Sequence, residues 1–155
     1  MVSPELLRRY PFFAFLDDAC QKAIAMLAEE VSYDRGEVIF RENQPAEAFH
    51  LLLEGCVDLY YTVEVEYGPQ PRREFLVGEI NPGEPFGISA LIEPYRLTST
   101  ARAATPCRVL KIDAAELRAL CDENRDAGYA LMRHAAKAAV ERLHFTRVQL
   151  AAARA

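Results

Sequence analysis

Short apolar runs separated by turn signals fill the middle of the chain, from Val31 to Leu110, and this alternation constrains the fold more than any other feature. Gly36, Gly55 and Gly83 mark three of the turns. Such a pattern is typical of an antiparallel β-sandwich or barrel. The expected strands are Glu30–Tyr33, Val38–Phe40, Ala48–Glu54, Cys56–Val65, Arg73–Ile80 and Thr100–Ile112.

Helical patterns flank this region on both sides. Asp17 or Asp18 can cap a helix near the N-terminus. Asp113 and Glu116 form a capping box, which predicts a helix directly after the last strand. A longer helix is expected from about residue 127 to the end. The chain is therefore expected to be an α+β protein. Its expected parts are N-terminal helices in residues 1–30, strands in 31–112 and C-terminal helices in 113–155.

The long C-terminal helix carries a heptad pattern of apolar positions that is rich in alanine. Two helices can approach closely along a seam of this kind. The pattern predicts either a dimer interface or packing of this face against the protein's own strands, and the residues alone leave both open. The seam positions are Tyr129, Ala136, Leu143 and Leu150 in one register and Met132, Ala139 and Thr146 in the other.

Length and composition argue against several classes of protein. With 155 residues the chain is expected to form a single domain. Its net charge of −5 is opposite in sign to the basic surface typical of nucleic-acid-binding domains. Four cysteines without a C-x-x-C pair argue against a zinc or iron–sulfur site, and no apolar run has the length of a membrane helix or a signal segment. We expect a cytoplasmic protein without a metal site.

The stretch from Phe86 to Ala103 is the candidate functional site. It follows a turn rich in proline and glycine, and Gly87 precedes a segment that can form one helical turn before Pro94. Small residues at the start of such a turn leave backbone N–H groups free to bind an anion. A glycine-proline corner inside a β-barrel has the same pattern. These residues alone therefore allow either a phosphate cradle or a purely structural turn.

Three motifs together resemble the cyclic nucleotide-binding domain of the catabolite activator and protein kinase A regulatory subunit superfamily. They are Gly36–Glu42, Leu53–Tyr60 and Phe86–Ala103, in the order of the family. The resemblance implies an antiparallel β-roll, a double-stranded β-helix of jelly-roll type, that binds a small ligand and signals through flanking helices to a protein partner. It also implies a homodimer through the last helix, which favours the dimer interpretation of the seam.

The phosphate-binding cassette of this family typically reads F-G-E-L-A-L, a loop, and then R-T/A-A-T-V-R-A. Here Ile88 stands where the family has a glutamate for the ribose 2′-hydroxyl, and Leu97 where it has an arginine for the cyclic phosphate. Arg96 directly precedes the position of the family arginine. Because neighbouring side chains of an extended segment point to opposite faces, Arg96 is not expected to replace that arginine. We therefore expect weak or altered recognition of a small anionic ligand, with cAMP and cGMP as the candidates. The resemblance assigns the ligand site to Gly87, Ile88, Ser89, Ala90, Arg96, Leu97, Thr98, Ser99 and, in the last helix, Thr146.

Two functions are consistent with this degenerate cassette. One is a regulatory module that senses a small ligand, and the other is a ligand-free dimerisation or docking scaffold in which Ile88 and Leu97 fill the old pocket. No enzymatic activity is expected, since nothing brings a nucleophile or metal to the acidic residues. No DNA binding is expected either, because transcription factors of the superfamily continue into a helix-turn-helix domain. His50 is expected to be a barrel-wall histidine, with a haem ligand as the alternative.

Overall fold

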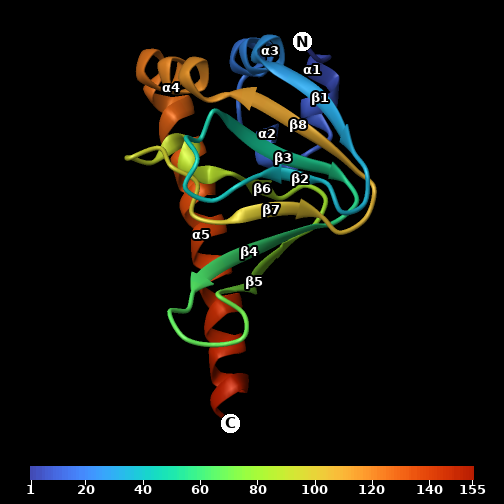
Figure 1. Ribbon diagram of the computed structural model, residues 1–155. Helices are drawn as coiled ribbons and strands as arrows, with labels where there is room; N and C mark the ends of the chain where they lie inside the picture. Colours follow the sequence, from blue (N-terminus) through green and yellow to red (C-terminus); the bar gives the residue numbers. More distant parts are fainter.

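Figure 1 shows the computed structural model, which describes all 155 residues. The strands form two four-stranded antiparallel sheets, with the orders β1-β8-β3-β6 and β2-β7-β4-β5. The expected α+β fold with an antiparallel β-roll is confirmed. The strands are β1 (Ala28–Tyr33), β2 (Val38–Phe40), β3 (Ala48–Glu54), β4 (Val57–Glu64), β5 (Arg72–Ile80), β6 (Pro85–Phe86), β7 (Thr100–Ala103) and β8 (Cys107–Asp113).

The two sheets and the N-terminal helices share one apolar core. Phe49, Ile80 and Leu110 are completely buried between the elements of the roll. The N-terminal helices are α1 (Pro4–Arg8), α2 (Pro11–Ala14) and α3 (Asp18–Leu27). Asp17, and not Asp18, caps α3, because its carboxylate accepts a hydrogen bond from the backbone N–H of Cys20 at 2.8 Å. Strand β1 follows α3 directly, so the roll begins three residues earlier than expected.

The expectation of one continuous strand over Thr100–Ile112 is wrong. The chain turns at residues 104–106, and β7 and β8 lie in different sheets. Pro106 explains the break, because proline has no N–H for a sheet ladder and restricts the residue before it. The turn lets β7 pair with β2 and β4, whereas β8 pairs with β1 and β3.

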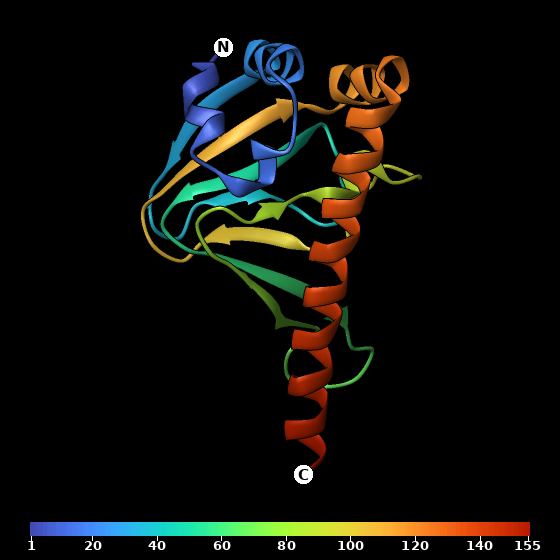
Figure 2. The same cartoon turned by 180° about the vertical axis from the view of Figure 1, so that it is seen from behind.

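Two helices complete the chain, α4 (Ala114–Glu123) and α5 (Arg125–Arg154). The predicted cap is confirmed: the Asp113 carboxylate accepts a hydrogen bond from the backbone N–H of Glu116 at 2.9 Å. Gly128 lets α5 approach α4, since a Cβ atom there would lie 2.8 Å from the carbonyl oxygen of Cys121. Figure 2 shows α5 running along the β-roll and extending beyond it at its C-terminal end. None of the helices combines the length and the apolar character needed to cross a membrane.

Only one face of α5 packs against the rest of the molecule. Leu131, Ala135 and Ala138 are buried on that face. The heptad seam lies on a different face, where Tyr129 is 67% exposed and Leu143 50% exposed. No seam position is buried, although the hydroxyl of Thr146 donates a hydrogen bond to the carbonyl of Val77, in β5, at 3.4 Å.

Candidate ligand-binding site

The cassette begins with a sharp turn at Gly87, between β6 and the 3-10 helix η1 (Ile88–Leu91). The backbone of Gly87 is left-handed, with φ 63° and ψ 34°. A Cβ atom there would lie 2.7 Å from Nδ1 of His50. Only glycine both adopts the left-handed backbone easily and leaves room for the imidazole. None of the backbone hydrogen bonds outside the regular elements is donated by Gly87, Ile88 or Ser89. These three amides are available to an anion at the start of η1.

A cavity of about 210 Å³ opens beside η1. Loop residues 97–99 form one wall, which is fixed because Leu97 donates to the carbonyl of Gln44 at 2.9 Å and accepts from the N–H of Asn43 at 2.8 Å. The cavity is smaller than the roughly 300–1,000 Å³ of most ligand pockets. Six predicted site residues line it: Gly87, Ile88, Ser89, Leu97, Thr98 and Ser99. The other lining residues are Phe40, Leu59, Ala139 and Arg142.

The remaining three predicted site residues do not line this cavity. Ala90, within η1, is completely buried, and its carbonyl accepts a hydrogen bond from a side chain of α4. Arg96 is exposed, and its guanidinium donates to the backbone carbonyl of residue 43, whereas its neighbour Leu97 is buried at the cavity. Thr146 lies on the exposed seam, where its hydroxyl is within donating distance of the backbone carbonyl four residues earlier, at 3.0 Å, and of the carbonyl of Val77 in β5, at 3.4 Å.

Arg142 lines the cavity from α5, and it also lines a neighbouring hollow together with Glu79, Glu84 and Glu141. Its guanidinium donates a hydrogen bond to the carbonyl of Pro85, directly before the cassette turn. It takes part in none of the ion pairs of the molecule. Burial lowers the pKa of Arg142 to about 10, an effect that Glu84 and Glu141 oppose. The side chain is therefore still charged at neutral pH, but it has no carboxylate partner.

His50 lies directly behind the cassette turn, in the barrel wall as expected. It is only 4% exposed and sits between Phe40 and Phe86, with ring centroids at 5.1 and 5.0 Å. Its Nδ1 atom has no hydrogen-bond partner. Burial, with a smaller contribution from Lys111, lowers the pKa of His50 to about 3. The imidazole is thus neutral at physiological pH and acts as a packing group beneath Gly87.

Four lining residues were not among the predicted site residues, namely Phe40, Leu59, Ala139 and Arg142. A signal for Arg142 is present in the sequence. Leu131, Ala135 and Ala138 recur at intervals of four and three residues, and Arg142 continues the series four residues later. A charged residue on the apolar face of an amphipathic helix is expected to be partly buried, and buried charged side chains often have a functional role. For the other three residues the sequence offers no comparable signal.

Comparison with known proteins identifies the family. Residues 30–124 match the family model of the cyclic nucleotide-binding domain. The structure is also similar to that of a candidate cyclic nucleotide-binding protein from Geobacter metallireducens, with a TM-score of 0.80 and 44% sequence identity. This similarity covers 93% of the present chain and 100% of the Geobacter chain.

Two curated relatives are longer proteins. One is a candidate potassium channel protein of Rhodopseudomonas palustris, 31% identical over 120 residues, which are 77% of this chain and 27% of the relative. The other is a CRP-like cAMP-activated global transcriptional regulator of Mycobacterium tuberculosis, 24% identical over 129 residues, which are 83% of this chain and 55% of the relative. The chain thus spans about a quarter to about half of the length of these relatives. By its family match and its similarity to the Geobacter protein, the chain belongs to the cyclic nucleotide-binding domain family.

Proposed function

We propose that this chain is a regulatory module that binds a cyclic nucleotide, cAMP or cGMP, in the cavity beside η1 and signals to a protein partner. The observation that carries the proposal is Arg142, a charged residue that lines the cavity and takes part in no ion pair. A cyclic phosphate placed between this guanidinium and the free amides of Gly87, Ile88 and Ser89 would supply the missing negative charge. Arg142 would then do, from α5, what the family arginine does from the position of Leu97.

The same arrangement implies an altered selectivity. Ile88 lines the cavity but offers no acceptor for a ribose hydroxyl. A charge-assisted hydrogen bond contributes roughly 1.5–3 kcal/mol, so loss of the glutamate alone weakens binding by about 10- to 100-fold. The proposed ligand is therefore recognised mainly through its phosphate, with an affinity below that of a complete cassette.

A ligand-free scaffold is the second candidate function. The observation in its favour is Leu97, which is 5% exposed and lines a cavity of only about 210 Å³. Together with Ile88 it places apolar groups where the family has charged ones. In a scaffold the remaining cavity would be a packing defect, and the exposed seam of α5 would carry the function.

Thermal unfolding with and without cyclic nucleotide separates the two functions. A ligand at 100 times its dissociation constant stabilises the folded state by about 2.7 kcal/mol. For a chain of this size that corresponds to an increase in Tm of about 5–10 °C. We expect such an increase with millimolar cAMP or cGMP, and a smaller one with AMP or inorganic phosphate, which lack the cyclic shape. A Tm that no nucleotide changes would overturn the sensor and support the scaffold.

The exposed seam supports a second part of the proposal, a homodimer through α5. Seven seam positions recur every three or four residues and none of them is buried, although most are apolar. A row of exposed apolar groups on one helix is the usual form of a helix-helix interface. The alanines at positions 136 and 139 would let two copies of α5 approach closely.

Substitution of one seam residue tests the dimer. We expect Leu143→Glu to make the protein monomeric in sedimentation velocity at micromolar concentration, because it places two buried carboxylates opposite each other. Val148→Glu is the matched control, since Val148 is on the same helix, is 55% exposed against 50% for Leu143, and lies off the seam. The homodimer would be refuted by a wild-type chain that sediments as a monomer, or by equal effects of the two substitutions.

A further inference from the structure

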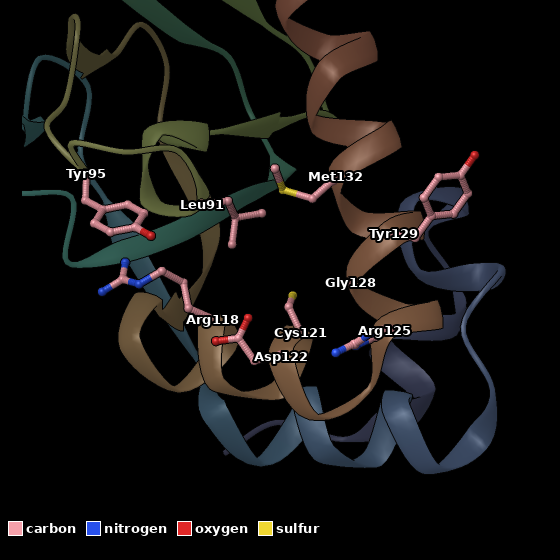
Figure 3. A pocket seen from close by; sticks show the side chains of 9 residues that line it. All are labelled: Leu91, Tyr95, Arg118, Cys121, Asp122, Arg125, Gly128, Tyr129 and Met132. Atoms are coloured by element: carbon pink, nitrogen blue, oxygen red, sulfur yellow. The ribbon is translucent and has the colours of Figure 1, made fainter.

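A second and larger cavity, of about 380 Å³, lies on the other side of η1, between the cassette loop, α4 and the start of α5. Figure 3 shows Leu91 and Met132 pointing toward its middle, with Tyr95 and Arg118 together at one side. Arg125 and Tyr129 border it from α5. None of its lining residues lines the cavity beside Gly87. We call this second cavity the α4 cavity.

The α4 cavity has a positive border. Arg118 and Arg125 line it, and Arg133 lies close by, with its guanidinium 5.8 Å from the ring centre of Tyr129. None of these three arginines takes part in an ion pair of the molecule. Asp122 is the one acidic residue in the lining. The surface is therefore locally basic on a chain whose net charge is −5.

Two of the lining residues, Tyr129 and Met132, are large exposed apolar side chains, and a third such residue, Ile92, directly follows the lining residue Leu91 in the chain. Ile92 is 46% exposed, Tyr129 67% and Met132 39%. Exposed large apolar groups that gather around a hollow mark a binding surface in soluble proteins. A small molecule inside the cavity would leave Ile92 and most of Tyr129 uncovered. A polypeptide segment would cover them while inserting one side chain between Leu91 and Met132.

The α4 cavity is connected to the nucleotide cassette through Arg118. This side chain donates a hydrogen bond to the carbonyl of Ala90, in η1, at 2.7 Å. Its guanidinium also lies 4.1 Å from the ring centre of Tyr95, in the cassette loop. Any movement of η1 that accompanies ligand binding on its other face must therefore shift a wall of the α4 cavity. Coupling of this kind is reciprocal: whichever ligand binds first changes the affinity for the other by the same factor.

We propose that the α4 cavity is the output site of the module, and that it binds a partner segment in which one large apolar residue is flanked by aspartate or glutamate. The apolar residue fills the space between Leu91 and Met132, and the acidic residues pair with Arg118 and Arg125. The proposal thus defines the chemistry of the protein partner. Only the coupling between the α4 cavity and the nucleotide rests on the proposed function.

Tyr129 and Met132 are also the first two seam positions of α5, so a second copy of the chain is the competing occupant. It is disfavoured at this end of the seam, because a symmetric contact would bring the same arginines together, and the dimer contact then runs from Ala136 to Leu150.

Selection from a library of displayed 12-residue peptides tests the proposal through the chemistry of the sequences that bind. The immobilised full chain is used at low salt and without nucleotide, and enriched peptides are then synthesised and titrated by fluorescence anisotropy. We expect enriched sequences to combine an apolar residue with acidic neighbours. Their affinity should fall at least about tenfold in Arg125→Glu, since one charge-assisted contact becomes a repulsion. That variant should fold normally, because glutamate is favourable in the first turn of a helix.

Two matched controls make the result specific. Arg35→Glu reverses an exposed arginine in the β1–β2 turn and should leave peptide affinity unchanged. Ile92→Gln should weaken binding, whereas Tyr67→Gln, at a residue that is 86% exposed in the β4–β5 hairpin, should not. The docking site is overturned if no sequence class is enriched, or if the enriched peptides bind Arg125→Glu as tightly as the wild type. A change in sedimentation of Arg125→Glu without peptide enrichment would overturn it in favour of a second copy.

The nucleotide arm of the experiment is read separately. With saturating cAMP or cGMP, the affinity for the enriched peptide should change by about fivefold or more, in either direction, and peptide should change the nucleotide affinity equally. If peptide binds and nucleotide binds, but neither affects the other, the role as an output site is overturned. If neither nucleotide binds, the proposed sensor function fails, whereas the docking site is still decided by the peptide titrations.

Discussion

Replacement of Arg142 by methionine is expected to weaken cyclic nucleotide binding by at least about 100-fold while leaving the unliganded protein at least as stable as the wild type. The loss of affinity follows from the two charge-assisted hydrogen bonds that a guanidinium can make to a phosphate. Each contributes roughly 1.5–3 kcal/mol, and about 1.4 kcal/mol is a factor of ten. Methionine keeps most of the volume of the side chain, so the cavity wall is preserved.

The same substitution should increase the stability of the unliganded protein. The pKa of Arg142 in the folded chain is about 10, below the ordinary value for arginine, and burial is the largest cause. A base whose pKa is lowered by folding destabilises the folded state while it is charged. This cost is fully present below about pH 10 and is relieved only as the pH rises above that value. Methionine removes this cost at neutral pH, which raises the free energy of unfolding by about 1–2 kcal/mol. The gain is smaller than the full pKa shift implies, because the side chain of Arg142 is still partly exposed.

The measurement is a pair of titrations, nucleotide affinity by calorimetry and unfolding free energy by urea, at pH 7. Arg96→Met is the informative control, because Arg96 is the cassette arginine closest to the family position but is exposed and outside the cavity. We expect it to change nucleotide affinity by less than about threefold. If Arg96→Met abolishes binding and Arg142→Met does not, the phosphate is held from the loop and the role assigned to Arg142 is wrong.

The fold was predictable because its signals are local. Glycine and proline turns divide Val31–Leu110 into strands, and the carboxylates of Asp17 and Asp113 cap helices where the sequence indicates. The prediction of a single strand over Thr100–Ile112 was wrong, because Pro106, itself a local signal, divides this segment into β7 and β8. The exposed seam of α5 was also predictable, because the heptad spacing of its apolar residues lies within a single helix.

The site was predictable only where the cassette is continuous in sequence. Gly87, Ile88 and Ser89 line the cavity because they follow one another through the turn and η1. Arg142 comes from an element more than fifty residues away, and the packing of α5 against β5 and β6 brings it there. The α4 cavity was not foreseen for the same reason, since the cassette loop, α4 and α5 each supply only two to four of its residues. Contacts between distant elements have no local signature in a single sequence.

Replacement of Gly87 by alanine is expected to destabilise the protein by about 2–5 kcal/mol and to abolish ligand binding. A residue with a Cβ atom at φ 63° costs roughly 1–2 kcal/mol. The added methyl group would also lie 2.7 Å from Nδ1 of His50 and 3.3 Å from Cε2 of Phe40. Overpacking of this kind typically costs a further 1–3 kcal/mol. Neither ring can easily move aside, because both are buried in the core.

Gly36→Ala separates the two contributions in urea denaturation at pH 7. Gly36 also has a positive φ, 88°, but a Cβ atom there would meet no atom within 4 Å, so only the conformational cost remains, about 1–2 kcal/mol. The double variant His50→Ala/Gly87→Ala gives a direct test of the contact, because removal of the imidazole makes room for the added methyl group. Its loss of stability should be smaller than the sum of the two single losses by at least about 1 kcal/mol. Simple additivity, or equal costs at Gly36 and Gly87, would show that His50 does not hold the cassette turn in place.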